Sequence, residues 1–423
     1  MIIILFFILF LVQDPLGQYI GLLSYVDEFF TILCWVLLLL KIVGASSGVI
    51  RVRKWTFKIF CCVVLMLLLG IGGNFIWHYQ SLKYITVDVL SYSKFFAGLA
   101  LGLTLGEKSK EEWIQKKTVI ICKCIAVIQF LLAVHEELFY PWFDYLRDGK
   151  ILRSLKLYYS NQTYFVSYSV FLMALLLLLN AEDKFNKFYI FMLVVSVSLS
   201  MRSKAWGFLV VFGLVALVTK NIRIRHPFLF AGACIPLVVY VVREKLVLYF
   251  FTSSHYSPRR IILEDGIALA QKYFPVGAGF GTFCSPGAAL GGSPVYNMLG
   301  TNYSVNYIAA AINDMYWGHL LGQYGFLGTI AMAAVLIILF CQIWKLQKRN
   351  RPQFLSACCL FIYIVIASFG ESPFFAPYII GFSFVLGLIL AEKGNRKDEK
   401  DIIVKQYVPL KGNAALWSVC SKL

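Results

Sequence analysis

Residues 58–76 read KIFCCVVLMLLLGIGGNFI, an apolar stretch that is long enough to cross a lipid bilayer as a single helix. A helix rises about 1.5 Å per residue and the hydrocarbon core is about 30 Å thick, so about 20 such residues span it. Further apolar runs lie near 2–13, 27–43, 85–105, 118–135, 163–180, 188–201, 204–219, 227–242, 315–343, 354–369 and 374–391. The sequence therefore predicts an all-α polytopic membrane protein with about twelve transmembrane helices.

The composition points to the same class of protein. Of the 423 residues, 60% are hydrophobic and 14% are charged, and the mean hydropathy is +0.75. A soluble domain is closer to half apolar and a quarter charged. The net charge of +17 comes from short clusters of Lys and Arg between apolar runs, as in cytoplasmic loops of membrane proteins. We therefore expect the lipid bilayer, and no nucleic acid, as a partner.

The eleven cysteines lie mostly within apolar runs, for example Cys122 and the pair Cys358-Cys359. None forms a CxxC motif, and no Cys/His set has the spacing of a zinc site. The sequence thus predicts neither a disulfide framework nor a metal site.

The distribution of basic residues predicts the orientation. When both termini are placed in the cytoplasm, the cytoplasmic loops hold more Lys and Arg than the outer loops. Two polar segments then lie outside, residues 136–162 and the large loop 243–314 between the ninth and tenth spans. A loop of this length usually carries a function. We expect one transmembrane domain over 1–391 and a cytoplasmic tail over 392–423.

A short apolar run meets three polar residues, Arg202-Ser203-Lys204. The run 187–201 gives a helix of roughly 21 Å, so this basic tip should lie at or slightly below the outer headgroups. Two cations at that depth are costly unless an anionic group or water meets them. Snorkelling of the side chains to the interface is one interpretation. A site for a lipid-borne phosphate is the other.

The large loop contains two further patterns. Arg259-Arg260 opens a segment that reads as a short amphipathic helix over 261–270. Arginine suits pyrophosphate because its planar fork donates paired hydrogen bonds, although a solvated basic turn or a headgroup contact explains the pair equally well. Gly277-x-Gly279-x-Gly281 lacks the βαβ surroundings of a dinucleotide loop, so it favours a tight turn with close backbone approach.

Asn313-Asp314 precedes the run 315–343. Either residue could cap that helix, because a side-chain oxygen there accepts from free backbone N–H groups. The alternative is that Asp314 faces the outer cavity as a general base. His319 is expected to be a packed residue. Asp88, Lys94 and Lys123 are too scattered to favour an ion path.

The order of these features resembles bacterial O-antigen and capsular polysaccharide polymerases and the related O-antigen ligases. The resemblance covers the basic residues after a short span, the loop arginine followed by a Pro-x-Gly-x-Gly turn, and the polar segment that leads into Gly322-Gln323-Tyr324-Gly325-Phe326-Leu327-Gly328. Tyr25-Val26-Asp27-Glu28 before the second span is also similar to the polymerases. The motif content lies within about 196–330.

The resemblance implies an enzyme of the bacterial plasma membrane that joins polyprenyl-pyrophosphate-linked oligosaccharide repeat units into O-antigen or capsule. Glycosyl transfer at the outer face would be inverting and metal-independent, with no cofactor. A flippase and a chain-length regulator are implied partners. The ligase is disfavoured because no His precedes Asn313. A transporter would place polar groups at the membrane midplane, and a scaffold component would tolerate loss of Arg260 and Asp314.

The family's motifs map onto particular residues of this chain. Its Ser-Arg motif falls on Ser203-Lys204, with Lys in place of Arg, and its loop arginine falls on Arg260. We therefore expect the pyrophosphate to be bound by Arg202, Lys204, Arg259 and Arg260. Asp314, Arg260 and Arg202 are the expected catalytic residues, and Pro275, Gly277 and Gly279 are expected to shape the loop.

Overall fold

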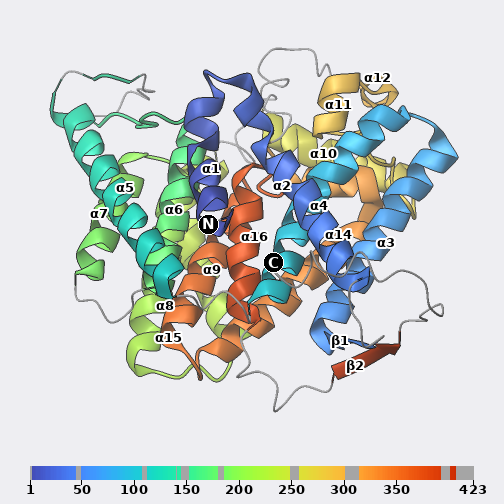
Figure 1. Cartoon of the computed structure of the whole chain (residues 1–423). Coiled ribbons are helices and arrows are strands. Elements are labelled where there is room, and N and C mark those ends of the chain that lie inside the picture. The colour runs from blue at the N-terminus through green and yellow to red at the C-terminus, as the bar shows by residue number, and fades with distance from the viewer. Residues whose placement is uncertain are drawn as a thin grey trace.

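Each apolar run that the sequence marks as a span forms a helix in the computed structural model (Figure 1). The structure describes residues 2–43, 49–106, 112–139, 141–143, 152–179, 185–247, 257–300, 314–391 and 401–405. The twelve helices are α1 (Ile2–Gly17), α2 (Val26–Val43), α3 (Lys54–Trp77), α4 (Leu82–Leu105), α5 (Glu112–Leu138), α6 (Gln162–Leu179), α7 (Asn186–Leu199), α8 (Ser203–Asn221), α9 (Pro227–Leu246), α14 (Tyr316–Leu346), α15 (Arg351–Ala367) and α16 (Tyr378–Leu390). The predicted helical class is confirmed for the described residues, apart from one short sheet.

Within the described residues, six helices are long and apolar enough to cross a membrane. They are α3, α4, the Lys116–Leu138 part of α5, α6, α8 and α14. Shorter apolar helices occur at Phe7–Gly17, Asn186–Leu199, Pro227–Leu237, Arg351–Ala367 and Tyr378–Leu390. The chain is therefore a helical membrane protein, while the expected number of twelve spans stays a prediction.

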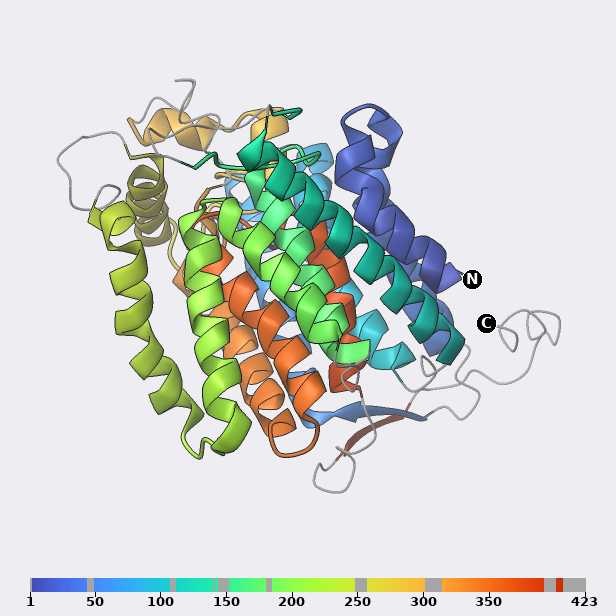
Figure 2. The ribbon, with the colours of Figure 1, turned by 90° about the vertical axis from the view of Figure 1, so that its left-hand side faces the viewer.

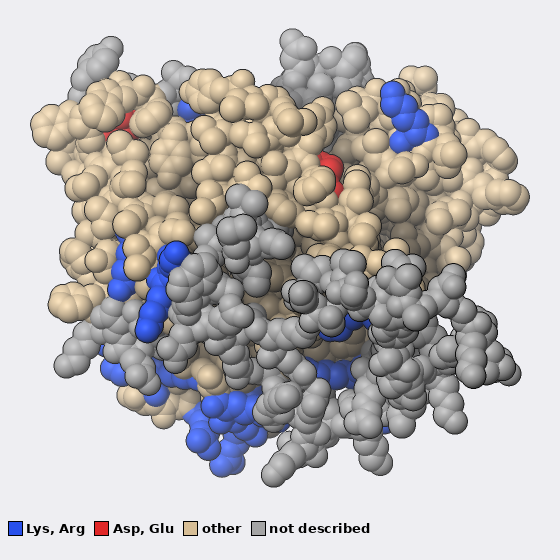
Figure 3. All heavy atoms as spheres, in the orientation of Figure 1, with Lys and Arg blue, Asp and Glu red and all other residues tan. Residues whose placement is uncertain are grey.

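A short sheet joins the chain before α3 to the segment after α16. Strand β1 (Val49–Arg53) pairs antiparallel with β2 (Asp401–Lys405), with Arg51 opposite Ile403. Arg53 also donates to the carbonyl oxygens of Leu390 and Ala391, at 2.5 and 2.7 Å. Part of the expected cytoplasmic tail over 392–423 is thus a strand. On the face drawn in Figure 3, Lys and Arg gather toward the end of the molecule where this sheet lies.

The large loop is folded where the structure describes it. It contains three helices that are joined by turns: α10 (Pro258–Lys272), α11 (Pro286–Gly291) and α12 (Pro294–Met298). Helix α10 confirms the amphipathic helix expected over 261–270. Figures 1 and 2 place α10, α11 and α12 at the end opposite the sheet, where the short helix η1 (Gly21–Tyr25) also lies. The expected loop begins later than residue 243, because 243–246 continue α9, and its segments 248–256 and 301–313 lie outside the described residues.

Close contact of α4 with α16 fixes the part of the bundle next to the candidate site. A Cβ atom on Gly102 would lie 2.2 Å from the Phe384 carbonyl oxygen, and one on Gly387 would lie 2.4 Å from that of Leu99. Small residues permit such approach between helices in membranes. This contact holds α16, whose first residue is Tyr378, firmly against the core.

Candidate functional site

The tight turn between α7 and α8 positions the first two cations. Helix α7 has 14 residues, as the length of its apolar run predicts. Met201 adopts a φ of 53°, a left-handed conformation that residues other than glycine rarely adopt. The Ser154 hydroxyl donates to the Ser200 carbonyl at 2.8 Å and holds the turn. Arg202 then precedes α8, and its Nη2 donates to Gln162 Oε1 at 3.0 Å.

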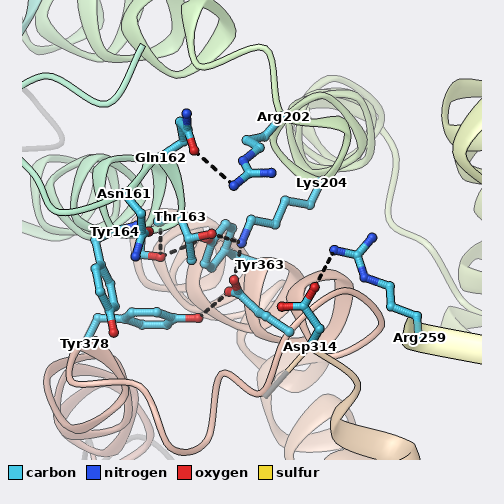
Figure 4. Close-up of polar contacts among 12 residues, drawn as sticks. Asn161, Gln162, Thr163, Tyr164, Arg202, Lys204, Arg259, Asp314, Tyr363 and Tyr378 are labelled. Carbon is cyan, nitrogen blue, oxygen red and sulfur yellow. Dashed lines mark hydrogen bonds and ion pairs between the residues drawn. The ribbon is translucent and has the colours of Figure 1, made fainter. Parts of the chain in front are cut away.

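Lys204 lies one residue into α8 and is mostly buried. Its Nζ donates to Thr163 Oγ1 at 2.8 Å and forms an ion pair with Glu371 (Figure 4). The other carboxylate oxygen of Glu371 accepts from the Tyr378 hydroxyl at 2.7 Å. Lys204 and Glu371 expose 15% and 14% of their side chains, so water screens this pair only partly. Burial and two partners, Thr163 and Glu371, fix Lys204 in one place.

The third cation comes from the large loop. Arg259, in the first turn of α10, forms an ion pair with Asp314, with 3.1 Å between Nη2 and Oδ2. Asp314 does not cap α14, because the helix begins after Met315 without a side-chain cap. The capping interpretation is therefore wrong for Asp314, while Asn313 lies outside the described residues. Burial raises the pKa of the Asp314 carboxyl above its ordinary value, and the charge of Arg259 opposes that shift only in part.

These two ion pairs share one space between the helices. Figure 4 shows Arg259 pointing toward Asp314, with Lys204 directed toward Thr163 and Arg202 toward Gln162 in the same part of the bundle. The charges of Lys204 and Glu371 both act on the pKa of Asp314, which places the two ion pairs within electrostatic reach of each other. We call Arg202, Lys204, Arg259, Asp314 and Glu371 the cation cluster. Its three cations and two carboxylates leave one excess positive charge.

Arg260 makes a different contact from its neighbour. Its Nε binds Glu264 Oε1 at 2.7 Å, one turn further along α10, and 47% of its side chain is exposed. We therefore leave Arg260 out of the cation cluster. Adjacent residues of a helix point about 100° apart, so α10 can direct only one of the two arginines toward Asp314.

The predicted turn residues insert the loop into the helix bundle. The N–H groups of Ala278 and Gly279 donate to the Gly322 and Gln323 carbonyl oxygens, both at 3.0 Å. Those carbonyls are free to accept because α14 is interrupted at Gly325, whose φ is 65°. Gly279 has a φ of 97°, and a Cβ there would lie 2.6 Å from Asn74 N. Pro275 precedes this turn, and Gly277 lies against the Gln323 backbone.

Asp88 anchors the same loop from α4. Its carboxylate accepts from Gly281 N at 2.7 Å, Gly287 N at 2.6 Å and Gln323 Nε2 at 3.0 Å. Asn74 adds a pair of 2.8 Å hydrogen bonds to the backbone of Phe280. Non-helical backbone within a membrane protein is stable where protein buries it and satisfies its hydrogen bonds. Asp88 is accordingly a loop anchor and not a member of the cation cluster.

Other polar residues named by the sequence are held in internal contacts. His319 is buried, hydrogen-bonds to Tyr92 and, through Nδ1, to the Phe283 and Cys284 carbonyl oxygens at 2.9 Å. It is the packed residue that we expected. Lys94 forms ion pairs with Asp27 and Glu28, the two acidic residues of the Tyr25–Glu28 motif. These groups join helices α2 and α4.

Sequence reasoning missed Glu371, together with its contacts to Lys204 on α8 and Tyr378 on α16. Glu371 lies 167 residues from Lys204 along the chain, and no local pattern reports such a pairing. One signal was present, since Glu371 is a carboxylate in the short turn between the last two apolar runs. A charge at that depth requires a partner.

No protein-family model matches this chain, and no curated protein is similar to it at a significant level. Among the described residues, no group of three or more His, Cys, Asp or Glu could hold a metal ion. The chemistry of the cation cluster is therefore argued from its own residues.

Proposed function

We propose that this protein polymerises polyprenyl-pyrophosphate-linked oligosaccharide repeat units into a surface polysaccharide, O-antigen or capsule, at the outer face of the bacterial plasma membrane. The observation that carries the proposal is the convergence of Arg202, Lys204 and Arg259 from two distant segments of the chain. Two carboxylates lie beside them. The resemblance of the motifs in the sequence to polysaccharide polymerases supplies the substrate class.

The charges suit a diphosphate leaving group. Two arginines donate in the planar, paired geometry that phosphate oxygens accept, and Lys204 adds a point charge. The acceptor hydroxyl attacks the anomeric carbon, the bond from that carbon to the diphosphate oxygen breaks, and the carbon inverts. Negative charge grows on the departing diphosphate, where fixed cations stabilise the transition state more than the ground state.

A carboxylate has to take the proton of the acceptor hydroxyl. Asp314 suits this role because it is the more exposed of the two, at 39% of its side chain, and Arg259 orients it. Its raised pKa makes it a better proton acceptor than an ordinary Asp. Glu371 is held by Lys204 and Tyr378, so we assign it the positioning of Lys204.

The orientation in the membrane follows from the charges of the loops. Lys and Arg gather toward the end with the sheet on the face drawn in Figure 3, and basic loops favour the cytoplasm. We propose that this end is cytoplasmic and that both termini are as well. The turn before α8, and with it the cation cluster, would then face outward, where lipid-linked repeat units are joined. A flippase would deliver these units and a chain-length regulator would set the number joined.

The test uses cells in which the gene is deleted and then restored as wild type, Arg202→Ala, Arg259→Ala or Arg260→Ala at matched expression. Polysaccharide length is measured on a gel. We expect a ladder with wild type and with Arg260→Ala, and single carrier-linked units with the other two variants. A normal ladder in the deletion strain would overturn the proposal. Loss of outward-facing carrier-linked repeat units in the deletion strain would favour a flippase instead.

A further inference from the structure

A second polar site lies beside the cation cluster, in a pocket of ≈ 250 Å³. The pocket opens between α1, the η1 turn and the N-terminal end of α6. Polar side chains of Gln13, Asp14, Gln18 and Ser24 line it, and the Tyr164 ring forms one wall. Pockets for drug-sized ligands measure about 300–1,000 Å³. This one accommodates a single ring with its polar substituents.

Three consecutive residues of α6 connect the cation cluster to the pocket. Gln162 holds Arg202, Thr163 holds Lys204, and Tyr164 lines the pocket. The Tyr164 ring also contacts the ring of Tyr378, with centroids 6.3 Å apart, and Tyr378 donates to Glu371. Figure 4 shows Tyr164 and Tyr378 at the edge of the cluster. One molecule could therefore occupy both places.

An unpartnered acceptor in the pocket lining points to a ligand. Gln13 is 2% exposed, and its Nε2 donates to Asp27 Oδ1 at 2.5 Å and to the Ser24 carbonyl at 3.2 Å. Its Oε1 is buried without a hydrogen-bond partner among the described residues. Leaving such an acceptor unsatisfied costs about 1–3 kcal/mol. Gln13 lines the pocket, so a ligand hydroxyl that reaches this oxygen as the side chain turns would remove that cost.

The pocket and the cluster have opposite charge. The lining of described residues includes the Asp14 carboxylate and no Lys or Arg. Asp14 accepts from Ser160 N at 2.9 Å and Ser160 Oγ at 2.6 Å, which holds it in place while leaving lone pairs free. An anionic group is therefore repelled from the pocket and attracted to the cluster. A molecule with neutral hydroxyls near a diphosphate matches both.

We propose that this pocket binds one neutral monosaccharide unit of the lipid-linked glycan and so positions the acceptor repeat unit. The inference rests on the proposed function for the identity of the glycan. Gln13 and Asp14 accept from sugar hydroxyls, Gln18 donates or accepts at the rim, and the face of Tyr164 packs on the ring. A small number of placed polar groups fixes the orientation of a ligand in a pocket, and an aromatic wall adds apolar contact.

The first test is capture of the ligand in living cells. A photoreactive benzoylphenylalanine replaces Gln18 at the pocket rim or, as the control, Tyr19, which is 85% exposed and outside the lining. After irradiation, the denatured protein is assayed for covalently bound carbohydrate by periodate oxidation and hydrazide labelling. We expect at least about tenfold more carbohydrate at position 18. Equal labelling at both positions, or phospholipid as the only adduct at position 18, would overturn the proposal.

The second test separates this inference from the proposed function. Asp14→Asn keeps the shape of the side chain but weakens its acceptance of hydroxyls. Elongation of extracted lipid-linked repeat units should show a higher KM for the acceptor with kcat nearly unchanged, while Arg259→Ala should lower kcat. An unchanged KM in Asp14→Asn would contradict the pocket. If carbohydrate is captured at position 18 but the protein elongates nothing, the sugar-binding pocket is supported and the polymerase function is refuted.

Discussion

Two adjacent arginines at the start of α10 have different surroundings, and this difference gives a matched pair of variants. Arg259 contacts Asp314 in the cation cluster, whereas Arg260 contacts Glu264 on the exposed side of α10. Removing one fixed donor that stabilises developing charge costs about 100-fold in rate. We expect Arg259→Ala to lower the rate of elongation by about that factor and Arg260→Ala to change it by less than about threefold. Elongation by purified variants, measured side by side, decides this.

Asp314 gives the protein an expected dependence on pH. A base acts only when deprotonated, so activity should fall as the pH drops through the pKa of Asp314. Burial raises that pKa, so the loss should begin at a higher pH than an ordinary Asp would give. Arg259 lowers the pKa, so Arg259→Gln should move the acidic limb to still higher pH. A pH profile of elongation tests this, with Asp314→Asn expected to be slow and to lack the limb.

Glycine in the inserted loop permits a test at the scale of elements. Gly279→Ala places a Cβ 2.6 Å from Asn74 N, whereas Gly292→Ala meets no atom within 4 Å. Both positions have positive φ, at 97° and 66°, so both variants carry a backbone cost of about 1–3 kcal/mol. Overlap adds about 1–3 kcal/mol for Gly279→Ala alone. We expect thermal unfolding in detergent to show the larger loss for Gly279→Ala. Equal losses would contradict the described insertion.

The elements could be predicted better than their contacts. The apolar runs specify helices of 13 to 31 residues, and α10 follows from its amphipathic pattern. The pairing of Gly279 with Gln323, and of Lys204 with Glu371, depends on three-dimensional packing that no local pattern encodes. Arg202, Lys204, Arg259 and Asp314 could be proposed from depth, charge and motif order, but Glu371 required the fold.

At the scale of the whole molecule, the proposed orientation assigns opposite sides of the membrane to the two ends of the bundle. Alkaline phosphatase folds only outside the cytoplasm of bacteria, and a cytoplasmic fluorescent protein fluoresces only inside. A phosphatase fused after Gly292, in the turn between α11 and α12, should be active. A fluorescent protein fused after Leu423 should be bright. The reverse pattern would place the cation cluster on the cytoplasmic side and contradict the proposed orientation.

That this protein polymerises lipid-linked repeat units is measured most directly as elongation in proteoliposomes. These contain the purified protein, extracted lipid-linked repeat units and no other protein. Polymer length and released polyprenyl diphosphate are measured together. We expect a ladder, with one diphosphate released for each new glycosidic bond, and loss of both in Arg202→Ala and Arg259→Ala but not in Arg260→Ala. Movement of repeat units across the bilayer without bond formation, or equal activity in all three variants, would contradict this expectation.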